Sequence, residues 1–411
     1  ELSLISDDGL GSEYRISLKS DSLKDTIPEA VADKIKNMPE TENVYATKYT
    51  MGELQISKNE FLSEEEWSDY FKYQNQEPYY IQRYDGICKQ QEDGNYRIKY
   101  NVYGYDEAMI EQLRDFILEG EIQPETIKNN NQVIVTANMD GQGNYFFYGK
   151  KPGDTITLRV PKTENYTDEL LKFQSGEENY IEKEFEIAAI VNRPLAQEKD
   201  FLNTEVWKNA QSVIMTGGQM EENFGITDYS FINASPADSA DAKIVSNQLL
   251  QVIRDVPKAV LQDYTTAIAT QKGYLGQQQI FFSSIAVILL IISLFHIVNS
   301  MSHTILTRRR EYGIIRAIGI TDGGFYKMIL QTGILYGLLA DVFIYLIYNR
   351  VLRRVMNYYL AHVLQFLHYT TNIPNLVLNG IMVLNVVIAV VAVMFPAWKM
   401  GKENIISEIR R

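Results

Sequence analysis

Residues 280–298 read IFFSSIAVILLIISLFHIV and contain no Lys, Arg, Asp or Glu. A helix rises about 1.5 Å per residue, so a stretch of this length crosses the roughly 30 Å hydrocarbon core of a bilayer. Two further apolar stretches follow, MILQTGILYGLLADVFIYLIY at 328–348 and LVLNGIMVLNVVIAVVAVMF at 376–395. The sequence therefore predicts three membrane-spanning helices in the last third of the chain.

Charge divides at the start of the first span. The chain holds 27 Lys/Arg against 47 Asp/Glu before position 280, and 12 against 5 from there on. The acidic first part lacks the basic face that phosphate neutralisation requires, which argues against nucleic acid as a partner. The single cysteine, Cys88, excludes an intrachain disulfide and a cysteine-based metal cluster.

Short loops orient a membrane protein through their Lys/Arg excess. The loop between the first two spans holds five such residues and the C-terminal tail four, whereas the loop at 349–375 holds three. We therefore expect the first loop and the C-terminus in the cytoplasm and residues 1–279 outside the plasma membrane. A domain translocated ahead of its first span needs an upstream signal, so we expect a fourth span before residue 1, or a longer permease of which this chain is half.

Residues 1–242 are expected to form an extracytoplasmic α+β domain. Thr26 and Glu29 fit a capping box before a helix at 28–37. Further helices are expected at 106–119 and 241–256, and strands at 97–103, 132–136, 155–160, 185–191 and 212–215. The stretches 58–96 and 162–182 resemble long surface loops.

Residues 243–279 are predicted to form a stalk that runs into the first span. Val245, Leu249 and Val252 recur at helical spacing, and Pro257 interrupts the pattern. An ordinary helix packed on the domain core would show the same stripe, so both interpretations stay open.

The first intracellular loop carries a spaced motif, R-x-x-E-x-G-x-x-R-A-x-G, within residues 299–330. Its members are Arg308, Glu311, Gly313, Arg316, Ala317 and Gly319. The small residues at 313 and 317 allow close helix approach, the charged residues offer contacts to a partner surface, and Gly319 is suited to ending the helix. A plain basic anchor gives no reason for this spacing.

This motif resembles the cytoplasmic loop of FtsX/MacB-like ABC transporter permeases. The tail from Pro396, a proline that is expected to close the last span, is similar to the ending of the same family. In the outer domain the helix at 28–37, the stretch 104–120 and the turn at 151–155 are similar to the MacB-type outer domain. The resemblance thus assigns a MacB-type outer domain and an FtsX-like module at 280–411. The resemblance implies a dimer, of two copies or two halves, that binds a separate cytoplasmic ATPase through a coupling helix at 305–320.

The resemblance also implies that ATP and Mg²⁺ are bound by the partner and that this bacterial plasma-membrane protein is itself not an enzyme. The ATPase would drive the outer domain mechanically, for export or extraction of a peptide, lipoprotein or drug. Two alternatives remain: a permease that senses antimicrobial peptides and signals to a histidine kinase, and a regulator of a cell-wall hydrolase.

Asp341 is the only formal charge within the three predicted spans. A carboxylate exposed to lipid costs several kcal/mol, so we expect this side chain to face the helical bundle. A gating contact and a structural hydrogen bond are equally good explanations. The sequence shows no P-loop, catalytic triad or H-E-x-x-H helix, so no catalytic or metal-binding residue is predicted.

Overall fold

The computed structural model describes residues 12–20, 22–60, 78–139, 144–164, 166–174, 178–195, 212–363, 373 and 375–401. The chain divides into two compact units. One consists of Glu1–Gln271 with Leu360–Tyr369 and is called the sheet unit. The other consists of Lys272–Tyr359 with Thr370–Arg411 and is called the helical unit.

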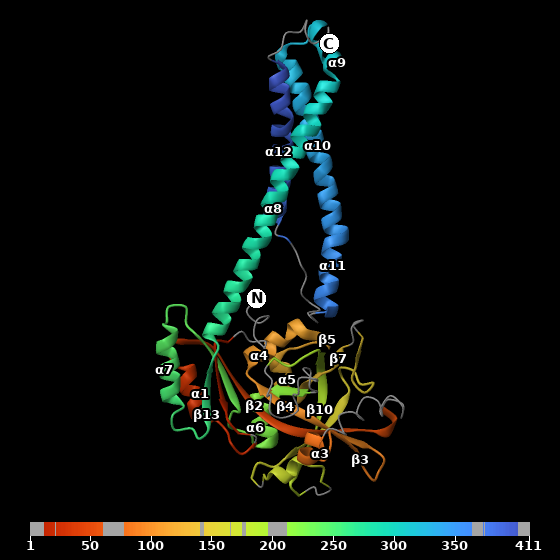
Figure 1. Cartoon of the computed structure of the whole chain (residues 1–411). Coiled ribbons are helices and arrows are strands. Elements are labelled where there is room, and N and C mark those ends of the chain that lie inside the picture. Colours follow the sequence, from red (N-terminus) through yellow and green to blue (C-terminus); the bar gives the residue numbers. More distant parts are fainter. Residues whose placement is uncertain are drawn as a thin grey trace. The chain divides into compact units, whose positions relative to one another are not determined.

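The sheet unit is built on one mixed sheet in the order β13-β1-β12-β2-β9-β10-β6-β11-β4-β3, with β5 paired to β10 (Figure 1). Because β2 also pairs with β4, the strands β2, β9, β10, β6, β11 and β4 form a closed ring of pairings. The strands are β1 (Tyr14–Leu18), β2 (Thr41–Ile56), β3 (Cys88–Gln90), β4 (Tyr96–Tyr105), β5 (Ile117–Gly120), β6 (Gln132–Thr136), β9 (Thr155–Pro161), β10 (Tyr180–Val191), β11 (Ser212–Thr216), β12 (Phe231–Pro236) and β13 (Ala259–Asp263). A separate two-stranded sheet joins β7 (Asn138–Met139) and β8 (Tyr145–Phe146).

Short helices cover this sheet. They are α1 (Glu29–Lys36), α3 (Pro78–Tyr84), α4 (Glu107–Gln112), α5 (Pro124–Asn129), α6 (Gly217–Phe224) and α7 (Ala242–Val252). Helix α6 begins with a capping box between Thr216 and Gln219 and ends at Gly225, whose φ is +67°. It lies close on β4 because Gly104 has no side chain: a Cβ there would stand 2.5 Å from Cγ of Met220.

The expected mixture of helices and strands is confirmed, with four local corrections. Helix α1 has Pro28 as N-cap and no side-chain cap, because Thr26 donates instead to Asp228. The helix expected at 106–119 ends at Gln112, and a 3-10 turn then leads into β5. The loop expected at 58–96 contains α3, β3 and the start of β4. The loop expected at 162–182 contains a 3-10 turn and the start of β10. Within these two stretches, residues 61–77, 165 and 175–177 lie outside the described residues.

The predicted stalk also needs correction. Val245 and Leu249 of α7 are fully buried in a core with Tyr14 and Ile16 of β1, and β13 then pairs with β1 along its length. Residues 243–263 are therefore part of the sheet unit, and the alternative of a core-facing helix holds. The continuous helix α8 begins only at Thr265 and runs to Thr307.

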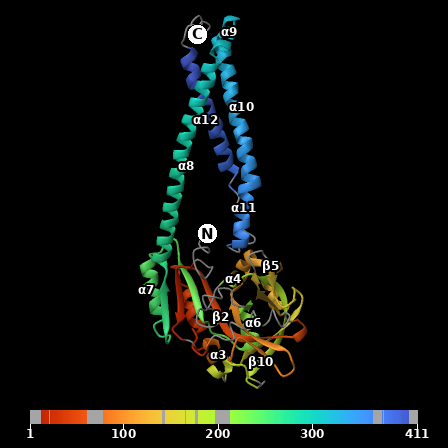
Figure 2. The same ribbon diagram turned by 45° about the vertical axis from the view of Figure 1, so that its right-hand side comes forward.

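The helical unit contains two of the three long apolar helices whole and the third from Lys272 onward (Figure 2). Helices α8 (Thr265–Thr307), α10 (Asp322–Ile347) and α12 (Asn375–Gly401) all belong to candidate membrane spans, which agrees with the three expected spans. Helix α10 continues through a π-helical turn, α11 (Arg353–Tyr358) and a second π-helical turn to Val363, where a loop was expected. Helix α12 passes through Pro396 rather than ending there, and residues 402–411 lie outside the described part.

Candidate functional site

The loop between the first two spans folds into a short separate helix, α9 (Arg309–Ala317). Arg308 lies between α8 and α9 with φ −95° and ψ 13°, which breaks the helical path. After α9, Gly319 adopts φ +110°, a left-handed conformation that disfavours side chains, and Thr321 caps α10 by accepting a hydrogen bond from the Gly324 amide. The expected coupling helix at 305–320 is thus the last turn of α8, α9 and the turn after it.

One face of α9 packs on the start of α10. Gly313 and Arg316 are buried, and the Tyr312 ring meets the Phe325 ring edge-on at 5.8 Å between centroids. The Arg316 guanidinium lies 5.6 Å from the centroid of the Phe325 ring and donates to Asp322 at 3.0 Å. Arg316, expected to offer its charge to a partner, therefore fastens α9 to α10 instead.

The opposite face of α9 is open. Glu311, Ile314 and Ala317 are exposed there, and Ile318 at the C-cap is 81% exposed. Arg308 and Gly319 are also exposed. The two isoleucines were not singled out from the sequence. Their i, i+4 spacing, with a charged residue three positions before the first, places them on one face of a helix and could have indicated this surface.

Helices α10 and α12 lie side by side through two glycines (Figures 1 and 2). A Cβ added at Gly337 would stand 2.9 Å from Cα of Val386, and one at Gly333 would stand 3.3 Å from Cα of Val390. At 337 the backbones are closer than a Cβ would permit, and at 333 a Cβ would fit only if a neighbour gave way by a few tenths of an ångström. The G-x-x-x-G spacing at 333–337 was legible in the sequence and was missed.

Asp341 continues the same face of α10, four residues after Gly337. It is 3% exposed, and Asn385 of α12 donates to its Oδ1 at 2.9 Å. The Asn385 amide also lies 3.4 Å from the Gly337 carbonyl oxygen. Asp341 therefore faces the neighbouring helix, as expected, and makes a hydrogen bond between spans; nothing in this geometry decides between a gating and a structural role.

The candidate site consists of α9 and the contact between α10 and α12. Within the described ranges no group of three or more His, Cys, Asp or Glu side chains is placed to hold a metal ion. Its chemistry is that of a contact surface: an exposed apolar and charged helix face, fastened to a close-packed helix pair.

Comparison with known proteins identifies this part of the molecule. Residues 283–405 match the family model for the FtsX-like permease C-terminal domain. Residues 283–405 form an FtsX-like permease domain. The FtsX-like domain thus contains α9, the glycine contact and Asp341, and the expected FtsX-like module is confirmed.

The wider chain is similar to permeases of ABC transporters. An uncharacterised ABC transporter permease of Methanocaldococcus jannaschii is 26% identical over 235 residues, which cover 56% of this chain and 55% of the relative. The chain thus spans about half the length of this curated relative. The resemblance to an FtsX-like ABC transporter permease, stated from the sequence, is confirmed by these two matches.

Two solved structures are similar to part of the chain. The periplasmic region of MacB from Actinobacillus actinomycetemcomitans aligns with a TM-score of 0.35 and 9% identity over 66% of this chain and 98% of that one. The extracellular domain of the noncanonic ABC-type transporter YknZ from Gram-positive bacteria aligns with a TM-score of 0.33 and 9% identity, over 61% and 100%.

Proposed function

We propose that the chain is the permease subunit of an ABC transporter and that it converts ATP hydrolysis by a separate cytoplasmic ATPase into movement of its extracytoplasmic domain. The work done would be export or extraction of a peptide, lipoprotein or drug. The FtsX-like domain and the similarity to an ABC transporter permease support the class of protein.

The single observation that carries the proposal is the two-sided packing of α9. One side is anchored to α10 through Arg316 and Phe325, and the other presents Glu311, Ile314 and Ile318 to whatever binds there. A helix that exposes isoleucines beside charged groups outside the spans is suited to a protein partner, since such side chains are usually buried. We assign this face to the ATPase.

The packing also offers a route for movement. A force on α9 reaches α10 through the Arg316–Phe325 contact, and α10 is held to α12 at Gly333 and Gly337. In the other direction along the chain, α9 follows α8, which is continuous from Thr307 back to Thr265, and a single residue separates α8 from β13. Helix α8 is thus a covalent link between the coupling loop and the sheet unit.

In this account the protein lies in a bacterial plasma membrane with residues 1–279 outside and the C-terminus in the cytoplasm. A second permease copy or half completes the assembly, and the ATPase supplies the bound ATP and Mg²⁺. The positive residues near α9 support this orientation.

The experiment that tests the proposal is co-purification of the permease with the ATPase encoded beside it, using Glu311→Ala, Ile318→Ser and the control Lys272→Ala. Lys272 is an exposed cation on α8, at the opposite end of that helix from α9. The α9 variants are expected to lose the ATPase while the control retains it. Equal recovery in all three would refute the assignment.

A further inference from the structure

The helix that contains α10 does not end where its apolar stretch ends. The apolar stretch closes at Tyr348, yet the chain stays helical through the π-helical turn Tyr348–Leu352 and α11 (Figure 2). Residues 348–359 hold Arg350, Arg353 and Arg354 and are called the arginine segment. Lys and Arg beside a span favour the cytoplasmic side, so three arginines at the opposite end of α10 from α9 require a separate reason.

One hydrogen bond marks the level at which the arginine segment leaves the apolar stretch. The Ile373 amide donates to the Tyr348 hydroxyl at 2.7 Å, and α12 begins two residues later. The end of one span and the start of the next therefore lie at one depth. At about 1.5 Å per residue, the three arginines follow about 3–9 Å beyond this level. The headgroup layer of a bilayer is roughly 5–8 Å deep, so the arginines lie at the depth of lipid headgroups.

The arginine segment has no counter-charge in the neighbouring sequence. Residues 342–402 contain no Asp or Glu. Arg350 and Arg354 are exposed and Arg353 is half-buried, and within the described residues none of the three forms an ion pair. Because they are spaced three and four residues apart, they share one side of the helix. A concentrated positive charge is thus open to a negatively charged partner.

Apolar and aromatic side chains are interleaved with these arginines. Six of them are each at least 41% exposed: Val351, Leu352, Val355, Met356, Tyr358 and Tyr359. A helix surrounded by water rarely keeps so many apolar side chains exposed. Aliphatic side chains, tyrosine rings and arginines with long apolar stems together suit the boundary between acyl chains and headgroups. The combination therefore favours a lipid surface over an acidic protein.

We propose that the arginine segment binds anionic phospholipid. The phosphate oxygens of the lipid accept hydrogen bonds from Arg350, Arg353 and Arg354, and its acyl chains lie against the exposed apolar side chains. The planar guanidinium group suits this role because it offers paired donors to phosphate. A lipid held there fixes the depth at which α10 leaves the membrane. The inference requires that α10 spans the bilayer and does not depend on the ATPase contact at α9.

The test is photocrosslinking of the full chain in phosphatidylcholine nanodiscs. Two trace probes are compared, phosphatidylglycerol and phosphatidylcholine with the same photoactivatable acyl chain. Crosslinked sites are mapped after digestion with chymotrypsin, whose cleavage sites the substitutions below leave in place. Labelling of residues 345–360 is divided by labelling of residues 381–391 in the middle of α12, which also shows that the chain is inserted. We expect the phosphatidylglycerol probe to label residues 345–360 at least about tenfold more than the phosphatidylcholine probe.

Two triple variants separate charge from the rest of the helix. Arg350→Gln, Arg353→Gln and Arg354→Gln combined should bring the two probes to within about twofold of each other, because each arginine beside an anionic surface contributes about fivefold. Lysine at the same three positions should retain a preference of several fold, because the positive charge remains. Loss of the preference in the lysine variant as well would refute the role of charge.

A matched control removes the same amount of charge elsewhere. Lys34, Lys183 and Lys243 are exposed cations of the sheet unit, and Lys34→Gln, Lys183→Gln and Lys243→Gln combined should leave the preference unchanged. Equal labelling by both probes in the parent chain, or a preference that persists in the glutamine variant of the arginine segment, would overturn the proposal. Labelling of α12 without labelling of residues 345–360 would also overturn it and would leave the arginines to an acidic protein surface.

Discussion

Replacing Gly337 with alanine should force α10 and α12 apart. The new Cβ would stand 2.9 Å from Cα of Val386 and 3.1 Å from its Cγ2, whereas carbon atoms pack best at about 3.5–4.0 Å. The nearest atom belongs to the backbone, so a rotamer change cannot relieve the clash, and the helices must separate by about 0.6–1 Å. Overpacking of this kind costs about 1–3 kcal/mol.

A matched control separates this contact from the general effect of alanine in a helix. Gly380 lies on α12, and a Cβ there meets nothing within 4 Å. Gly380→Ala should therefore be neutral or slightly stabilising, because alanine favours the helix over glycine by up to about 1 kcal/mol. The stability difference between the two variants reports the α10–α12 contact alone.

The measurement is the free energy of unfolding during SDS titration in dodecyl maltoside micelles, followed by pulse proteolysis of the full chain. We expect Gly337→Ala to unfold at clearly lower SDS than both the parent chain and Gly380→Ala. If Gly337→Ala were as stable as Gly380→Ala, the close approach of α10 to α12 would be refuted.

Three further predictions concern charged groups. Asp341→Leu leaves the amide of Asn385 without its acceptor and should lower the free energy of unfolding by about 1 kcal/mol in the same SDS titration, whereas Asp341→Asn should lower it by less. If Asp341→Asn also left coupled ATPase activity unchanged, a gating role for Asp341 would be excluded. Arg316→Ala should destabilise the helical unit by about 1–2 kcal/mol through lost ring packing, while removing the charge of its exposed partner by Asp322→Asn should change little. Hydrogen bonds from Lys258 and Ser20 lower the pKa of Asp25, so the ion pair of Asp25 with Lys258 stabilises the fold above the unfolded-state pKa of about 4, and this stabilisation is lost as the pH falls through the folded-state pKa. Lys258→Gln removes the pair and should therefore flatten the loss of thermal stability between about pH 5 and 3. A profile of melting temperature against pH that is unchanged in Lys258→Gln would contradict this.

The membrane helices were predictable because a bilayer imposes length and apolarity over long stretches, which a single sequence displays directly. The expected strand at 132–136 matches β6, since a short β-branched run bounded by turn residues has few alternatives. Helix α7 was harder to place, because the apolar stripe of Val245 and Leu249 is the same in a helix packed on the domain core and in a stalk that leads to the first span. Only the pairing of β13 with β1 decides between them.

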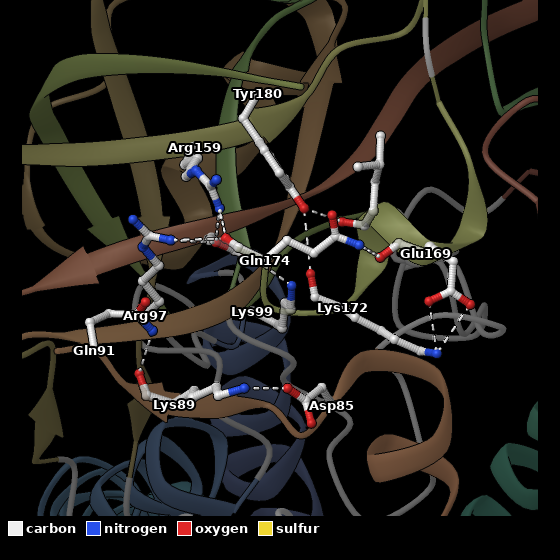
Figure 3. A network of polar contacts seen from close by, with 12 residues as sticks. Asp85, Lys89, Gln91, Arg97, Lys99, Arg159, Glu169, Lys172, Gln174 and Tyr180 are labelled. Atoms are coloured by element: carbon white, nitrogen blue, oxygen red, sulfur yellow. Dashed lines mark hydrogen bonds and ion pairs between the residues drawn. The ribbon is translucent and has the colours of Figure 1, made fainter. Parts of the chain in front are cut away.

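The motif at residues 308–319 shows a similar limit. Its spacing singled out the loop between the first two spans, and Gly319, expected to end the helix, follows α9 with φ +110°. The sequence could not show that Arg316 faces inward, because its partner Phe325 lies on the next helix and only the turn between them brings the two together. The contact between Arg97 and the Gln174 carbonyl (Figure 3) was missed for the same reason: it spans 77 residues, and no local pattern records it.

The most direct test of the central claim is coupled ATP hydrolysis by the permease–ATPase complex in lipid, comparing the parent with Glu311→Ala and Ile318→Ser. Both side chains are exposed, so these changes should leave the permease folded, whereas changes at buried Gly313 would confuse loss of contact with loss of fold. The account predicts that both variants lose the permease-dependent part of ATP turnover while Lys272→Ala retains it. Turnover equal to that of the parent in both α9 variants would contradict it.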